Sequence, residues 1–137
     1  SGTLAETDAD LLQPNVVRDE DLTFWFRGCM SDCKDLFFDQ ASAYGVDPFL
    51  AIAIADHETG YGISDACNTN NNFGGLMDSN GIRNYGSKEE GIKALMYLLQ
   101  VYKAKGRDTV ESIAEYYCAG SSEWINRVTT IYNSFHQ

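Results

Sequence analysis

Residues 48–59 constrain the fold most, because their run FLAIAIA at 49–55 is apolar on every side of a helix. Asp47 and Pro48 stand at its start, and an N-cap residue followed by a first-turn proline is typical of a helix N-terminus. A helix that is apolar all round is buried. The sequence therefore predicts a central helix enclosed by the rest of the chain.

Glu58 ends this predicted helix, inside the segment HETGYGIS at 57–64 and just before Gly60. A helix C-terminus carries partial negative charge, and apolar surroundings remove water from a carboxylate. Both effects favour the protonated form near neutral pH, which suits a group that donates a proton. We therefore take Glu58 as the candidate catalytic acid; the alternative is a surface glutamate at a helix end.

Apolar periodicity and capping residues predict four further helices, over residues 33–44, 88–105, 108–117 and 122–135. Ser31 is a candidate N-cap for the first, and Ser87 with Glu90 forms a capping box for the second. Asp108 opens the third, and Ser121 or Ser122 caps the last.

The glycine- and asparagine-rich segment 60–86 breaks this helical pattern and predicts a loop or a small β lobe. Within it, Asn80 and Gly81 favour a type I′ turn, so residues 77–85 are a candidate hairpin. The expected fold is mainly α (α+β), with a central buried helix and a small irregular β lobe that together form a cleft.

The 137 residues are enough for one hydrophobic core and too few for two. Residues 1–22 are acidic, show little periodicity and are predicted to be a linker or an arm. The folded domain is expected over 23–137, with the aromatic residues 24–26 packing the arm onto the core.

The net charge of −10 and the pI near 4.4 argue against a nucleic-acid partner, which needs clustered Lys and Arg. No apolar run approaches the roughly 20 residues of a membrane span, so we expect no membrane partner. A substrate held by hydrogen bonds and stacking, such as a neutral sugar, fits this charge. We expect a monomer that needs no cofactor.

Four cysteines, Cys29, Cys33, Cys67 and Cys118, allow three disulfide pairings, and the sequence does not choose among them. Cys29 and Cys33 are close enough on a helix to bond, which would leave Cys67 to pair with Cys118; free thiols are the alternative. The spacing of the cysteines with His57 and His136 matches no common ligand pattern, so no metal site is predicted.

Three motifs occur in a fixed order: ETGYGIS after the central helix, NNFGG at 71–75, and NYGSKEEG at 84–91. In this order they resemble the bacterial peptidoglycan glucosaminidases of the lysozyme-like superfamily, which act in flagellar assembly and as autolysins. The resemblance covers roughly residues 35–135. It implies that Glu58 is the general acid, that residues 71–74 line a sugar cleft, and that residues 85–87 open the next helix.

The segment GGLMD at 74–78 resembles a second group of the superfamily, the soluble lytic transglycosylases, with Asp78 in place of a glutamine. Asp78 is our candidate for a second catalytic carboxylate, because the resemblance to lysozyme-like folds implies a second group in the polar lobe, facing the cleft, and Asp78 lies in that lobe 20 residues after Glu58. It is alternatively an ordinary hairpin aspartate. An N-acetylated substrate can also supply its own acetamido oxygen as the nucleophile, which makes a second carboxylate unnecessary.

Aromatic residues and glycines complete the candidate site. The resemblance places a tyrosine near the cleft, and we predict that Tyr117 fills this role while Tyr116 packs in the core. Trp124 can stack on a sugar ring or belong to the core, and Tyr85 shares this ambiguity. The remaining candidate substrate-binding residues are Asn72, Phe73, Gly74 and Gly75; we expect Phe73 beneath the cleft and the backbone of the others near the ligand.

The function we expect is a secreted or cell-wall-associated peptidoglycan N-acetylglucosaminidase, whose signal peptide is absent from this sequence. A lytic transglycosylase or muramidase on the same polymer is the enzymatic alternative. A non-catalytic glycan-binding module is the alternative from another class.

Overall fold

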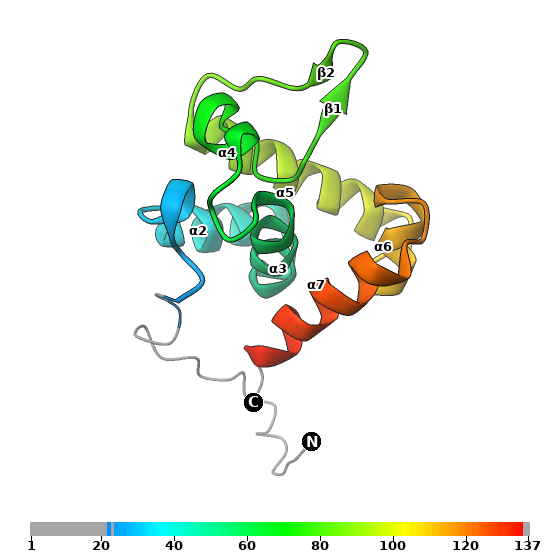
Figure 1. The fold of residues 1–137 in the computed structure, drawn as a ribbon. Coiled ribbons are helices and arrows are strands. Elements are labelled where there is room, and N and C mark those ends of the chain that lie inside the picture. The colour runs from blue at the N-terminus through cyan, green and yellow to red at the C-terminus, as the bar shows by residue number, and fades with distance from the viewer. Residues whose placement is uncertain (1–21, 23, 136–137) are drawn as a thin grey trace.

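A computed structural model describes residues 22 and 24–135, so most of the predicted arm over 1–22 lies outside the described residues (Figure 1). The architecture is mainly helical with one two-stranded antiparallel sheet, which confirms the predicted fold class. The elements in chain order are η2 (Gly28–Met30), α2 (Lys34–Tyr44), α3 (Pro48–Thr59), α4 (Asp65–Asn70), β1 (Met77–Asp78), β2 (Gly81–Ile82), α5 (Lys88–Ala104), α6 (Val110–Tyr117) and α7 (Ser122–Ser134).

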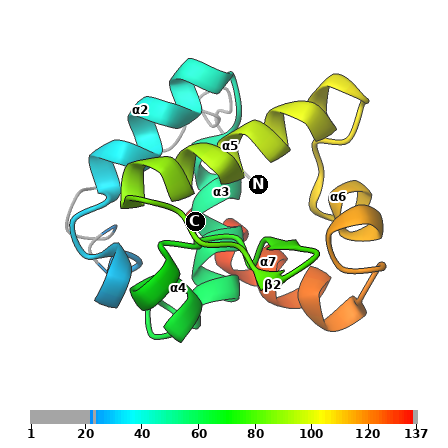
Figure 2. The ribbon, with the colours of Figure 1, turned by 90° about the horizontal axis from the view of Figure 1, so that it is seen from above.

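Helix α3 is the predicted central helix. Asp47 caps it by accepting a 2.9 Å hydrogen bond from the Phe49 N–H, and Gly60 ends it in the left-handed conformation at φ 59°. Every residue from Leu50 to Asp56 is buried, because α2, α5 and α7 pack around α3 (Figures 1 and 2). The all-round apolar pattern therefore identified the core of the fold correctly.

Two predicted helix starts are wrong by one or two residues. Helix α2 begins after Cys33 and not after Ser31, because the preceding residues first form the short 3-10 helix η2 and the turn that follows it. Helix α6 begins after Thr109, whose side chain and that of Ser112 form a reciprocal capping box in place of the expected Asp108. The caps of α5 at Ser87 and of α7 at Ser121 are as predicted.

The middle segment contains the short helix α4, which we did not predict, followed by the hairpin, which we did. Ser64 caps α4. In the hairpin Met77 pairs with Ile82 and Asp78 with Gly81, so Ser79 and Asn80 form the connection. The turn therefore lies one residue earlier than the predicted Asn-Gly turn, and of its residues Gly81 alone has a positive φ, 110°.

The segment before α2 is joined to the segment after α3 by a disulfide and by close backbone packing. Cys29 bonds to Cys67, while Cys33 is free and buried and Cys118 is free and half-buried. The pairing of Cys29 with Cys33 and of Cys67 with Cys118 is therefore wrong. Beside the disulfide, the Cys29 N–H donates to the Gly62 carbonyl at 3.0 Å, and a Cβ at Gly62 would overlap the Arg27 carbonyl.

Two of the three aromatic residues before η2 pack on the core, whereas almost all of the arm that we predicted them to dock lies outside the described residues. The rings of Trp25 and Phe135 lie 5.2 Å apart, and those of Phe26 and Phe37 lie 5.8 Å apart. Phe24 remains exposed. Within the described residues, no helix is both long and apolar enough to cross a bilayer.

Candidate active site

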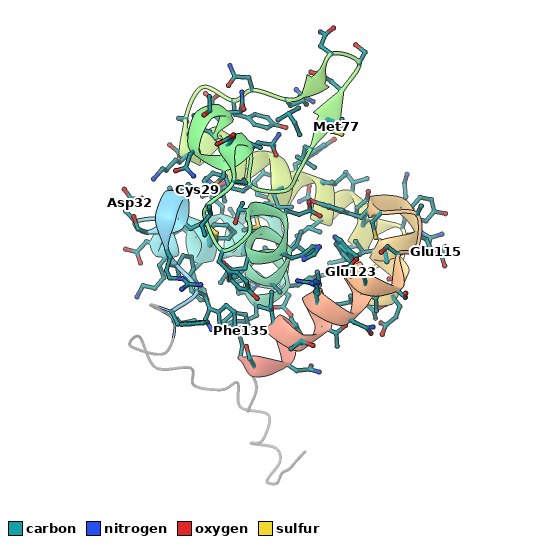
Figure 3. All side chains as sticks on the ribbon, viewed as in Figure 1. Cys29, Asp32, Met77, Glu115, Glu123 and Phe135 are labelled. Atoms are coloured by element: carbon teal, nitrogen blue, oxygen red, sulfur yellow. A yellow bond between two sulfur atoms is a disulfide. The ribbon has the colours of Figure 1, made fainter. Side chains whose placement is uncertain are left out.

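Glu58 lies in the last turn of α3 and is half-buried. It lies beneath the start of the hairpin and its flanking residues, 74–85, which we call the hairpin lobe. Its Oε2 accepts a 2.8 Å hydrogen bond from the indole N–H of Trp124, which comes from the first turn of α7. Glu123, the neighbour of Trp124, marks this turn in Figure 3. Two helices far apart in sequence therefore fix the position of the carboxyl group.

Burial raises the pKa of Glu58, and this is the largest influence on it. The Trp124 hydrogen bond and the nearby His57 act in the opposite direction, because both favour the charged carboxylate. The direction agrees with the sequence-based expectation of a protonated acid. The physical cause that the structure supports is removal from water.

Gly75 lies directly against the carboxyl group. It has φ +65°, and a Cβ built on it would overlap Glu58 Oε1. Its neighbour Gly74 is equally confined, because a Cβ there would meet the Tyr117 hydroxyl. The glycines of the NNFGG motif are therefore required by the close approach of the backbone to two side chains of the site.

Tyr117, which we predicted to lie near the cleft, contacts two residues beside Glu58, Gly74 and Trp124. Its hydroxyl donates a short hydrogen bond to the Gly74 carbonyl, and its ring lies 5.3 Å from that of Trp124. Burial, and secondarily the charge of Glu58, raise the pKa of Tyr117 well above its usual value. The hydroxyl therefore stays protonated and anchors the base of the hairpin lobe.

Four of the predicted substrate-binding residues are buried, namely Gly74 and the three described next. Phe73 is fully buried beneath the lobe, as expected. Asn72 is 1% exposed, and its side chain binds the Leu76 carbonyl, the Leu76 N–H and the Arg83 carbonyl, so it holds the hairpin together. Trp124 is 4% exposed, which leaves no open ring face for a sugar and gives it the role of a partner to Glu58.

Asp78 and Tyr85 lie on the lobe itself. Asp78 is exposed; it accepts a hydrogen bond from the Asn80 N–H at 2.8 Å, and its other oxygen lies 4.0 Å from Arg83 Nε. The strand that carries it, β1, extends away from α3 (Figure 1), and Figure 3 labels its first residue, Met77. Tyr85 is half-buried, with its N–H bound to the Asn70 carbonyl.

Tyr116 and His57 are the sequence neighbours of Tyr117 and Glu58. Tyr116 is 57% exposed and accepts a hydrogen bond from Arg107, so its predicted core packing is wrong. His57 is half-buried with its ring 6.3 Å from that of Trp124. Across residues 22 and 24–135, no group of three or more His, Cys, Asp and Glu side chains is placed to hold a metal ion.

Asp56 is the titratable residue that sequence reasoning missed. It is completely buried, and neither carboxyl oxygen has a hydrogen-bond partner among the described residues. Burial raises its pKa to about 8, against a smaller opposite effect of Arg27. The available signal was its position, directly after the apolar run that predicted the central helix.

A buried helix that presents a single glutamate beneath a small β lobe defines a lysozyme-like protein. The family model named Glucosaminidase, described as mannosyl-glycoprotein endo-β-N-acetylglucosaminidase, matches residues 34–137. The chain therefore belongs to the Glucosaminidase family, and this membership supports a glycoside hydrolase. No curated protein matches the sequence.

Proposed function

We propose that this protein is an endo-β-N-acetylglucosaminidase that cleaves the glycan strands of bacterial peptidoglycan, with Glu58 as its general acid. The observation that carries the proposal is the half-buried Glu58 carboxyl group, held by Trp124 on one oxygen and bordered by Gly75 at the other. Family membership supports the class of reaction. The order of the ETGYGIS, NNFGG and NYGS motifs supports the polymer.

The hydrogen bond from Trp124 determines which oxygen delivers the proton. Because Oε2 accepts from the indole, the acidic proton resides on Oε1, on the side of Gly75. Transfer of this proton to the glycosidic oxygen leaves a carboxylate, and the Trp124 N–H stabilises that charge. The site is therefore compatible with both the protonated and the charged form of Glu58.

The second chemical role belongs to the substrate. Asp78 lies exposed on the hairpin with its oxygens directed to Asn80 and Arg83, which argues against a nucleophile fixed opposite Glu58. We assign the role to the 2-acetamido oxygen of the sugar, which attacks the anomeric carbon as the glycosidic bond breaks. The Glu58 carboxylate then removes a proton from the water that opens the cyclic intermediate.

We also propose that the protein is secreted or associated with the cell wall. The Cys29–Cys67 disulfide supports it, because such bonds persist in oxidising compartments. The substrate lies in the same place.

The test is digestion of purified peptidoglycan with the parent protein and with Glu58→Gln, followed by borohydride reduction and mass spectrometry of the products. We expect reducing N-acetylglucosamine ends from the parent alone. Reducing N-acetylmuramic acid ends would identify a muramidase, and anhydro ends, which borohydride does not reduce and which lack one water relative to an unreduced reducing end, would identify a lytic transglycosylase. No products from either protein, with equal binding of both to the wall, would identify a glycan-binding module.

A further inference from the structure

A groove of about 700 Å³ lies between the hairpin lobe and α5, separate from the carboxyl group of Glu58. Pockets for small ligands span about 300–1,000 Å³, so this groove can hold a short peptide or a disaccharide. Two large apolar side chains at it are open to solvent, Met77 at 66% and Tyr97 at 58% exposure. Exposed apolar side chains grouped around a hollow are typical of a binding surface.

The charge of the groove is opposite to that of the chain. The chain has 20 acidic and 10 basic residues, whereas the groove is lined by two basic residues, Arg83 and Lys93, and one acidic residue, Glu90. A ligand with carboxylates would be repelled by most of this surface and attracted here.

Both cations are available to a ligand. Lys93 is exposed and has no carboxylate within ion-pair distance in the described part of the chain. Arg83 is 4.0 Å from Asp78, at the limit of an ion pair, and both side chains are about half exposed. Such a pair contributes little, about 0–1 kcal/mol, and yields easily to a bound anion. The Arg83 guanidinium also lies 5.4 Å from the centre of the Tyr85 ring, which orients it.

The groove and the candidate acid share one short piece of chain. Gly75 touches Glu58, and the next two residues, Leu76 and Met77, line the groove. A polymer whose backbone reaches Glu58 therefore places its side branches within reach of the groove. In peptidoglycan the lactyl carboxyl groups of the glycan are consumed in amide bonds, so free carboxylates belong to the peptide stems.

We propose that this groove, between the hairpin and α5, binds the carboxylate-bearing peptide stem of peptidoglycan through Arg83 and Lys93, with Tyr85 and Tyr97 as apolar contacts. The proposal rests on the proposed function and deepens it: the enzyme selects glycan that carries peptide over bare glycan.

Binding is tested without any turnover. A synthetic stem peptide, L-alanyl-γ-D-glutamyl-L-lysyl-D-alanine, is titrated into the isotopically labelled parent and followed by NMR. We expect shifts confined to the hairpin and the exposed face of α5, and binding about tenfold weaker for the double variant Arg83→Gln/Lys93→Gln or for the peptide with amidated carboxylates. No shifts in this region, or equal binding of the amidated peptide, would overturn the proposal.

Selectivity is tested by kcat/KM on soluble glycan strands with their stems and on strands that are stripped by an amidase and then amidated at the lactyl carboxylates that the amidase frees. We expect the parent to have a higher kcat/KM on stem-bearing strands than on stripped strands. The ratio of these two values should be about tenfold lower for the double variant. The matched control is Lys105→Gln/Arg127→Gln, which removes the same charge from exposed positions outside the groove. A parent ratio near one, or an equal loss in the control, contradicts stem recognition.

If the parent cleaves neither kind of strand, the proposed activity is contradicted instead. The peptide titration then still tests whether the groove binds the stem. Circular dichroism verifies that each variant is folded.

Discussion

The indole N–H of Trp124 donates to Oε2 of Glu58 across 66 residues of sequence, so the end of α3 and the start of α7 meet at the candidate acid. The contact is at 2.8 Å, within the range of a charge-assisted hydrogen bond. It stabilises the carboxylate and opposes the effect of burial on the pKa of Glu58. The pKa of Glu58 therefore depends on a balance between burial and this hydrogen bond.

Replacing Trp124 by Phe removes the hydrogen bond and keeps an aromatic ring. The pKa of Glu58 should rise further, so that the loss of kcat on the alkaline side occurs at a higher pH than in the parent. The maximal kcat should fall by about tenfold, since the carboxyl group loses its orientation and its stabilisation after proton transfer. The measurement is the pH profile of kcat on soluble glycan. An alkaline limb that stays in place or moves to lower pH would contradict this role of Trp124.

Substituting Gly75 by Ala should abolish most of the activity, because the added methyl group overlaps Glu58 Oε1. We expect kcat to fall by about a hundredfold, as for a displacement of a catalytic group by an ångström. Gly45→Ala is the matched control, since Gly45 has φ +69° and open space around its Cβ position. Both variants should lose about 1–2 kcal/mol of stability from backbone strain, and only the first should lose catalysis. Equal activity of the two would refute the steric argument.

Tyr117→Phe removes the hydroxyl that binds the Gly74 carbonyl. The free energy of unfolding should fall by about 1 kcal/mol, and kcat/KM by about tenfold, because the glycines beside Glu58 lose their anchor. Tyr116→Phe is the control, as its exposed hydroxyl binds only Arg107 among the described residues. Chemical denaturation and steady-state kinetics measure the two effects. The assignment fails if Tyr116→Phe is the more damaging change.

Asp56 predicts a pH dependence of stability. Its pKa is about 8 in the folded protein against an ordinary 3.8, so the folded state retains a proton that the unfolded state releases between these values. Its contribution to stability is fully present below about pH 4 and is lost progressively as the pH rises to about 8. We expect Asp56→Asn to raise Tm above that of the parent at pH 8 and to change it little at pH 4. A difference between the two proteins that is independent of pH would exclude Asp56 as the source.

The Cys29–Cys67 disulfide closes a loop with a sequence separation of 38 residues. Its reduction should lower the free energy of unfolding by about 3–4 kcal/mol on the loop-entropy model. Thermal unfolding with and without reductant measures the effect, and Cys118→Ser should respond like the parent, because Cys118 is free. Thiol titration of the unfolded, unreduced protein should find two free thiols. A count of zero or four would be incompatible with this pairing.

The helical framework could be predicted from sequence because its signals are local. The apolar run of α3, its Asp47 cap and the Ser87 cap of α5 depend on residues within a few positions of one another. Glu58 could be identified for the same reason, since it follows the run that defines the helix.

Features that depend on distant pairing could not be predicted. The partner of Trp124, the choice of Cys67 for Cys29, and the close approach of Gly75 to Glu58 are set by how the helices pack. Helix α4 was missed because six residues rich in Asn and Thr carry no periodicity, although the cap at Ser64 was a usable signal.

The disulfide and the backbone contacts that join the segment before α2 to the loop after α3 limit how far the chain can be shortened from its N-terminus. The family match begins at residue 34, yet Cys29 is bonded to Cys67, and the backbone from Arg27 to Cys29 covers Gly62. A protein cut at residue 34 would expose the buried Cys67 and uncover the loop that follows the candidate acid. We therefore expect the smallest unit that folds to start upstream of the matched region, before residue 27.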